Sequence, residues 1–288
     1  MLTRRVSLLT SSWTPTLALM LGATSWGVLW YPFRAIEAAG LPVPVATFVA
    51  YFFALILGGL VFRRAWREFL YHAKWLLAIG ICAGITNVAY LVAIMEAEVV
   101  RIVLLFYLAP LWTVPLAHVI LKERLTLTGY GVMLLALGGA LVMLWRPELG
   151  LPLGLCAGFT FALSNVLVKG AVAVSPEAKS LSVCIGVLVV ALPVAVVLCP
   201  AGQQTSCLIV PHLFLLAVVG AVLISTSVIL QFGLSRLSAN RAAVILLFEL
   251  IVAAAAAHYL AGEITRTMDW IGGAMIVSAG VFATIAEP

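Results

Sequence analysis

Apolar residues run together in long stretches along the chain, separated by short segments that contain charged residues, glycine or proline. Each stretch is apolar on all sides and spans about 16–23 residues, which suits a helix crossing roughly 30 Å of hydrocarbon. A membrane barrel would instead alternate apolar and polar residues. The pattern predicts an all-α integral membrane protein with ten transmembrane helices, at residues 14–34, 44–62, 75–95, 99–121, 129–144, 151–168, 178–198, 213–234, 239–259 and 270–285.

The composition indicates that a bilayer is the solvent of the chain. Of its 288 residues, 64% are hydrophobic and 9% are charged, and the mean hydropathy is +1.20. Soluble domains carry about 25% charged residues, so this composition excludes a soluble enzyme, a nucleic-acid binder and a disordered protein. No phosphate-binding loop, serine-hydrolase elbow or zinc-protease motif occurs. We therefore expect a membrane protein that is not an enzyme and whose function resides among its helices.

Basic residues predict the orientation, because lysine and arginine are retained on the cytoplasmic side of a membrane. With a cytoplasmic N-terminus, twelve of the 16 basic residues fall in inner segments, and only Arg34, Arg101, Arg146 and Arg266 fall in outer ones. Ten spans then place the C-terminus in the cytoplasm as well. The net charge of +5 is explained by inner loops that lie beside anionic lipid. We expect a multi-pass protein of the bacterial inner membrane.

Two halves of the chain repeat each other at a spacing of 140 residues. This spacing aligns, without a gap, Gly80 with Gly220, Thr86 with Thr226, Arg101 with Arg241, His118 with His258 and Glu123 with Glu263. Four of these pairs are polar residues, which are scarce in this chain. The alignment predicts two five-helix repeats, at residues 1–146 and 147–288.

Five spans is an odd number, so the second repeat must be inverted across the membrane relative to the first. Inverted repeats give many secondary transporters two exchangeable states, each open to one side, with a shared site near the midplane. The predicted fold is therefore two inverted repeats around a central cavity. A rigid membrane scaffold built by duplication remains an alternative.

Several segments are typical of one membrane protein family. They are Ser25-Trp26-Gly27, Tyr90-Leu-Val-Ala-Ile before LLFYLAPLW, and the paired segments LKERLTLTGYGVM and AGEITRTMDWIGGAM. On these segments the chain resembles, over almost its whole length, the EamA-type transporters of the drug/metabolite transporter superfamily. That resemblance implies ten helices as two inverted five-helix repeats around a central cavity. Within the superfamily the chain looks most like the YddG-type exporters of aromatic and other neutral amino acids.

The resemblance implies a secondary transporter that exports amino acids by alternating access. Its partners would be a small-molecule substrate and the lipid bilayer, without nucleic acid or cofactor, and a monomer is sufficient for one central path. A drug or other metabolite exporter is the first alternative, since aromatic linings also suit flat cations. A non-transporting scaffold or receptor is the second. Whether a proton gradient drives transport stays open.

Glu249 is the only acid deep within a predicted span. A charged group in hydrocarbon costs several kcal/mol unless it faces water, a partner or the interior of the bundle. Either Glu249 faces the cavity, where it binds a substrate ammonium or carries a proton, or it is a neutral side chain bonded to a neighbouring helix. Members of the family often have Glu-Pro here, whereas this chain has Leu250 after Glu249, so the kink of relatives is in question.

Aromatic and small polar residues within the spans are the other candidates for the cavity lining. Such cavities are lined by aromatic side chains, with a few polar groups that fix orientation. Lipid-facing positions or packing between helices are the alternative for each of them. The candidates are Trp26, Tyr51, Asn87, Tyr90, Tyr107, Trp112, Ser164, Asn165, Ser227 and Gln231.

The remaining candidates concern gating and covalent chemistry. Arg101 and Arg241 begin the fourth and ninth spans on opposite sides and are either gate residues, which meet acids such as Glu98, or snorkelling anchors. Cys199 and Cys207 fall in one outer loop, where a disulfide is predicted. No pair of histidines or cysteines has the spacing of a metal site, so no metal is expected.

Overall fold

The computed structural model describes residues 13–122, 127–143, 150–198, 205–234, 245–246, 248–264 and 266–286. Within these residues all regular secondary structure is helical. The elements are α1 (Trp13–Ala38), α2 (Val43–Val61), η2 (Arg63–Ala65), α3 (Trp66–Glu96), α4 (Val99–Phe106), α5 (Ala109–Leu121), α6 (Leu127–Met143), α7 (Leu151–Gly170), α8 (Pro176–Leu198), α9 (Thr205–Leu234), α11 (Phe248–Ala261) and α12 (Thr267–Ala286).

Each predicted apolar run is helical over its described residues, apart from Phe62 at the end of the second run and Tyr107 and Leu108 within the fourth. By length and composition, five helices of the described chain are long and apolar enough to cross a membrane, or up to six if residues 99–113 and 115–121, which are bent relative to each other, form one span. The protein is therefore an all-helical, multi-pass membrane protein.

In the fourth run, residues 99–121, Pro110 and Pro115 predict one helix that is bent where each proline removes a backbone donor. The structure departs from this prediction. The run forms two helices, α4 and α5, and the chain leaves helical geometry at Tyr107 and Leu108. Pro110 lies in the first turn of α5, where the missing N–H costs no hydrogen bond. A further bend of 45° separates residues 99–113 from residues 115–121. Only this second bend coincides with a proline inside a helix, Pro115.

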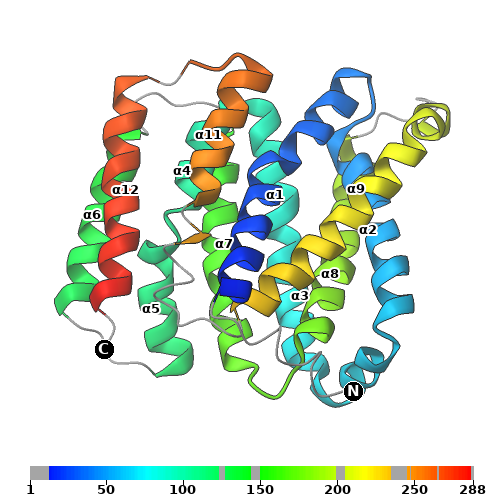
Figure 1. The fold of residues 1–288 in the computed structure, drawn as a ribbon, viewed down its shortest axis with the longest axis horizontal. Coiled ribbons are helices and arrows are strands. Elements are labelled where there is room, and N and C mark those ends of the chain that lie inside the picture. Colours follow the sequence, from blue (N-terminus) through cyan, green and yellow to red (C-terminus); the bar gives the residue numbers. More distant parts are fainter. Residues whose placement is uncertain are drawn as a thin grey trace.

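The helices pack across the two halves of the sequence (Figure 1). The α3 helix packs against α7 and α8, while α9 packs against α1 and α2, and α2 packs against α8. The α1 helix also contacts α11, and α4 and α5 contact α7. At one edge of the molecule, α6 and α12 form a pair (Figure 1).

Glycines allow the central helices to approach closely. A Cβ on Gly84 would collide with the carbonyl oxygen of Gly186, and a Cβ on Gly186 would collide with that of Gly80. In the same way, a Cβ on Gly220 of α9 would collide with the carbonyl oxygen of Ala50 of α2. Lipid supplies no hydrophobic force between helices, so close backbone packing of this kind stabilises the bundle.

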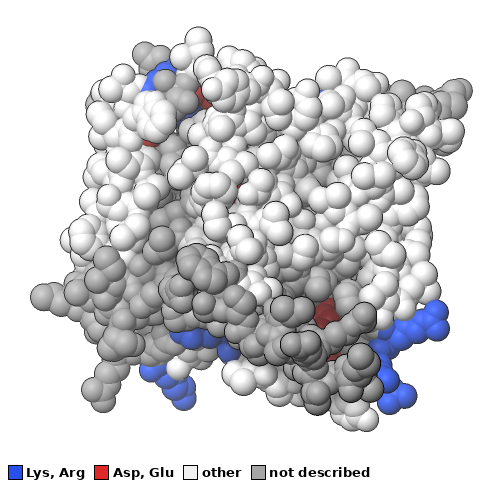
Figure 2. Space-filling model, in the orientation of Figure 1, with Lys and Arg blue, Asp and Glu red and all other residues white. Residues whose placement is uncertain are grey.

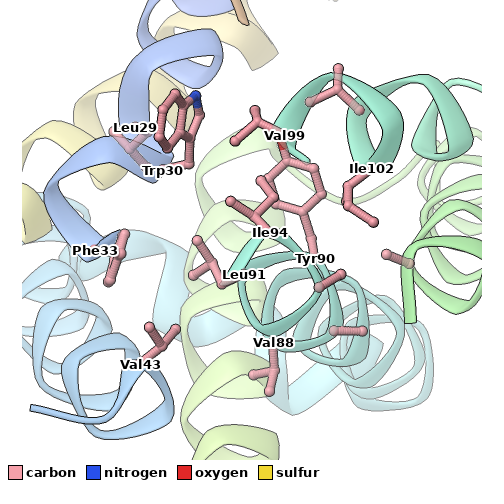
Figure 3. Packing of buried hydrophobic residues seen from close by; sticks show 14 of the residues in the cluster. Leu29, Trp30, Phe33, Val43, Val88, Tyr90, Leu91, Ile94, Val99 and Ile102 are labelled. Carbon is pink, nitrogen blue, oxygen red and sulfur yellow. The ribbon is translucent and has the colours of Figure 1, made fainter. Parts of the chain in front are cut away.

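Large side chains fill the space between α1, α2, α3 and α4 (Figure 3). Trp30 is fully buried, and its indole Nε1 donates to the carbonyl oxygen of Gly27 at 2.9 Å. Figure 3 shows Tyr90 pointing from α3 toward Val99 and Ile102 of α4. This packing fixes the end of α3 against the start of α4, next to the helix break.

A spacing of 140 residues also relates features of the backbone. The α5 helix ends at Leu121 and α11 ends at Ala261. The residues that follow, Lys122 and Gly262, both have positive φ angles, of 57° and 67°. The next helices begin at residues 127 and 267. After each helix comes a residue with positive φ, a common helix end in which following backbone N–H groups bond to the last carbonyl groups of the helix.

Candidate functional site

The break between α4 and α5 directs Tyr107 toward α11. The Tyr107 hydroxyl lies 2.8 Å from Oε2 of Glu249 and 2.9 Å from the carbonyl oxygen of Leu246. Glu249 occupies the first turn of α11 and is 9% exposed. Broken helices that release backbone groups at mid-membrane depth are a feature of transporter binding sites. The contact joins the only acid that the sequence places deep within a span to the one helix break in the fourth run.

Aromatic rings surround the break. The ring of Phe106 at the end of α4 lies 5.2 Å from that of Tyr90, 5.8 Å from that of Tyr107 and 4.4 Å from that of Phe161, measured between centroids. These four residues come from α3, the α4–α5 break and α7. Such a cluster presents flat apolar faces beside the carboxyl group of Glu249.

Among the described residues, Oη of Tyr90 and Nε1 of Trp112 are buried and have no hydrogen-bond partner. The Trp112 ring packs edge-on against Phe159, with 5.5 Å between centroids. A buried donor that lacks a partner costs about 1–3 kcal/mol. A bound molecule with hydrogen-bond acceptors would recover that free energy.

Close packing of α1 holds α11 in place. A Cβ on Gly27 would lie 3.0 Å from the carbonyl oxygen of Glu249 and 2.9 Å from Val252. The glycine of the Ser25-Trp26-Gly27 segment is thus explained by contact between these helices. Trp26, its neighbour, is partly buried and packs against the main core.

Other predicted cavity residues bond within the protein, away from Glu249. Tyr51 of α2 donates to Oδ1 of Asn87 of α3 at 2.6 Å, and Asn87 donates to the carbonyl oxygen of Ala83. Ser227 of α9 donates to the hydroxyl of Ser180 of α8 at 3.1 Å. The bonds from Tyr51 and Ser227 connect neighbouring helices. Packing between helices was the alternative to a place in the cavity lining for each of these residues.

Three further predicted residues lie elsewhere. Ser164 is buried in α7, and Asn165, its neighbour, is exposed. The side chain of Gln231 lies outside the described residues. None of the three is brought to the Tyr107–Glu249 contact by a described hydrogen bond.

A network of ion pairs lies at the α11–α12 end of the molecule. Nε of Arg101 lies 3.3 Å from Oδ1 of Asp269, and both side chains are almost completely buried. Arg34 lies 2.8 Å from Oε1 of Glu263 and also donates to the carbonyl oxygen of Ile94. Oε2 of Glu263 accepts from the backbone N–H of Val99 at 2.8 Å.

Arg101, predicted as a gate residue or an anchor, belongs to this network. One ion pair of Arg101 in the described residues is with Asp269, and an oxygen of the Glu98 carboxylate lies 3.6 Å from the guanidinium of Arg266. Arg101 is 3% exposed, and its role as a gate residue or an anchor stays a prediction. Arg241 lies outside the described residues, as do Cys199 and the side chain of Cys207, the predicted disulfide pair.

Metal binding and thiol chemistry depend on the histidines, cysteines and acids of the described part of the chain. No group of three or more potential metal ligands occurs there. Cys82, Cys156 and Cys184 are free thiols.

Sequence reasoning missed the rings of Phe106 and Phe161, the Leu246 carbonyl and the role of Asp269. Phe106 stands beside Tyr107 in LLFYLAPLW, a segment already singled out, and this adjacency was the available signal. Phe161 is one apolar residue among many in its span, so nothing in the sequence marks it.

Comparison with known proteins agrees with this architecture. Residues 13–145 match the EamA-like transporter family. A protein of Archaeoglobus fulgidus named as an uncharacterized transporter is 26% identical over 220 residues, which cover 73% of this chain and 76% of that protein. A solved crystal structure shares the fold, with a TM-score of 0.57 and 18% identity over 93% of this chain and 97% of that chain. Residues 13–145 are thus similar to EamA-like transporters, and most of the chain is similar to a protein named as a transporter.

Proposed function

We propose that the protein exports amino acids, chiefly aromatic and neutral ones, across the bacterial inner membrane by alternating access. The observation that carries the proposal is the contact of Tyr107 with Glu249 at the helix break, beside the rings of Phe106, Tyr90 and Phe161. An acid deep in a span is costly unless it serves such a site.

The groups at this site suit the parts of an aromatic amino acid. The carboxylate of Glu249 pairs with the substrate ammonium group, which is a charge-assisted hydrogen bond. The rings of Phe106 and Phe161 take the side chain by edge-to-face or offset stacking. The unpaired Nε1 of Trp112 and Oη of Tyr90 are donors for the substrate carboxylate.

Hydrogen-bond counting supports a proton on Glu249 when no substrate is bound. The Tyr107 hydroxyl carries one proton, yet two acceptor atoms, Glu249 Oε2 and the Leu246 carbonyl oxygen, lie within 2.9 Å of it. Both contacts are satisfied when Glu249 is protonated and donates to Tyr107, which then donates to Leu246. Binding of an ammonium group would release this proton, which couples substrate and proton at one residue.

The packing of the helices supports two equivalent halves. If α1, α2 and α3 are exchanged with α7, α8 and α9, the α3–α8 contact becomes α9–α2, and α3–α7 becomes α9–α1; all four contacts are present. The helix ends at Leu121 and Ala261, with positive φ at the next residue of each, fit the same exchange. Inverted halves of this kind allow a path that opens to each side in turn.

The ion-pair network supports closure at the α11–α12 end. Arg34 of α1 holds Glu263, and Arg101 of α4 holds Asp269. We assign to these pairs the role of an outer gate, whose opening would separate α12 and the preceding loop from α1 and α4. Breaking a buried ion pair is costly, so the closed state at this end is well defined.

Counterflow in proteoliposomes tests the proposal. Vesicles preloaded with an unlabelled solute should accumulate labelled phenylalanine or tryptophan when they contain the protein, and Glu249→Gln should abolish the effect of an imposed pH gradient. Tyr130→Phe, which removes a hydroxyl from a half-exposed tyrosine of α6, is the matched control for Tyr107→Phe. Flux of flat organic cations in place of amino acids would favour the drug exporter. Absence of flux for every solute would leave the scaffold alternative.

A further inference from the structure

A basic elbow connects α2 to α3. It consists of η2 and the first two turns of α3, residues 63–71, and it carries Arg63, Arg64 and Arg67, all exposed, against one acid. That acid, Glu68, accepts from the backbone N–H of Ser175 at 2.7 Å, so its carboxylate is engaged away from the arginines. In Figure 2, blue surface gathers at the edge of the molecule where α2 ends. The elbow therefore presents a concentrated positive charge.

The same elbow exposes apolar side chains. Leu70 and Tyr71 are 80% and 81% exposed, and Trp66 is 39% exposed. At His72 the backbone leaves helical geometry, with φ −124° and ψ 26°, which separates residues 66–71 from the rest of α3. Basic residues next to exposed aromatic and aliphatic ones are typical of a segment that lies in the membrane interface.

Contacts with the end of α2 hold the elbow in a defined place. Trp66 Nε1 donates to the carbonyl oxygen of Gly59 at 3.2 Å, and the Trp66 ring lies 5.4 Å from that of Phe69. Arg63 Nε donates to the carbonyl oxygen of Leu60 at 3.2 Å. The arginines thus project from a fixed support.

An apolar groove begins beside the elbow and runs between α2 and α9. Its lining includes Leu57 and Val61 of α2, Phe62 directly after α2, and the facing Ile224 and Val228 of α9. Ser225 is the only polar residue of the lining. The groove has a volume of about 330 Å³, at the lower end of the range for small-molecule sites. Phe62, at the end of the groove, directly precedes Arg63 and Arg64.

We propose that this groove and elbow bind one anionic phospholipid, with an acyl chain between α2 and α9 and the phosphate on Arg63 and Arg64. The charge of the elbow complements an anionic head group, and the apolar groove complements a chain that continues into the bilayer. A second copy of this protein docked face to face would instead bring two basic elbows together, which repel. The site is independent of the transported substrate.

Native mass spectrometry of the purified full-length protein tests the proposal. In detergent with equal concentrations of phosphatidylglycerol and phosphatidylcholine, which have the same acyl chains, one phosphatidylglycerol should be retained preferentially. Arg63→Gln with Arg64→Gln should weaken its binding at least tenfold, because each basic residue near a lipid surface contributes about 1 kcal/mol. The control, Lys122→Gln with Lys169→Gln, removes the same charge from two positions outside the elbow and should leave the binding within twofold of the unaltered protein.

A second arm tests the acyl chain. Ser225→Phe fills the groove without touching the arginines and should lower retention of long-chain phosphatidylglycerol at least fivefold, while glycerol phosphate, which has no chain, should not be retained by any variant. Equal retention of phosphatidylcholine, equal retention of glycerol phosphate, or a dimer without lipid would each overturn the proposal. The thermal midpoint of each variant without added lipid shows that it is folded.

Discussion

Tyr107 connects parts of the chain that are 139 and 142 residues apart in the sequence, through Leu246 and Glu249. Both Tyr107 and Glu249 were predictable as candidates, because a hydroxyl and an acid within apolar spans are costly without a role. Their contact was not predictable. The rotation of each helix about its axis depends on packing with its neighbours, and apolar runs that are uniform on all sides carry no information about it.

Replacing Tyr107 by phenylalanine should reduce transport at least tenfold and destabilise the fold by about 1–3 kcal/mol. The hydroxyl is the described bond partner of Glu249 Oε2, and removal of one partner leaves a buried polar group without a hydrogen bond. Flux in proteoliposomes and thermal unfolding in detergent measure the two effects. Tyr130→Phe should change neither; equal behaviour of the two variants would contradict the role given to Tyr107.

Arg101 and Asp269 should behave as a buried pair. Removal of either charge, by Arg101→Met or Asp269→Leu, should cost about 3–5 kcal/mol, because the other charge stays buried after losing its opposite charge in this pair. The double variant should be more stable than either single one. A double-mutant cycle of unfolding free energies checks this, and additive losses would show that the two side chains do not interact.

At the scale of elements, the break between α4 and α5 is the feature that the sequence predicted least well. Pro110 and Pro115 suggested bends at their own positions. A bend of 45° does lie at Pro115, but the break between α4 and α5 lies at Tyr107 and Leu108, before either proline. The reason is that Pro110 is compatible with the first turn of a new helix. Pro110 thus marks the start of α5 rather than an interruption within a helix.

Contact between α3 and α8 depends on glycine. Gly186→Ala should destabilise the protein by about 1–3 kcal/mol, because the added Cβ meets the backbone of Gly80 and the helices must separate. Gly131→Ala on α6 meets no atom within 4 Å, so it should be neutral or stabilise by up to about 1 kcal/mol. Thermal midpoints of the two variants, compared with the unaltered protein, decide the matter; a stable Gly186→Ala protein would refute the close approach.

At the scale of the whole molecule, the apolar runs predicted the helical membrane architecture well, because a run of that length has few other stable structures in lipid. The sequence indicated some residues of the ion-pair network and missed others. Glu263 was visible from its alignment with Glu123, but Asp269 lies at the start of a helix near a loop, where acids are ordinary. Only the packing of α4 against α12 shows that Asp269 is buried with Arg101.

Weakening the proposed outer gate should loosen the α11–α12 end without unfolding the bundle. Glu263→Gln removes the charge that Arg34 pairs with and weakens the acceptor of the Val99 N–H. Backbone amides of residues 262–264 and 98–101 should then exchange hydrogen faster, as measured by mass spectrometry. Glu177→Gln, at the start of α8, is the control. Unchanged exchange in Glu263→Gln would remove the gate from the account.

The central claim is that two inverted halves enclose one path. Lys122 and Ile264 lie in the corresponding segments that follow α5 and α11, and both are exposed. In protein whose five cysteines have been replaced, Lys122→Cys should react with a membrane-impermeant maleimide from the cytoplasmic side only, and Ile264→Cys from the opposite side only. Reaction of both cysteines from the same side would contradict the inverted arrangement and, with it, the path proposed between the halves.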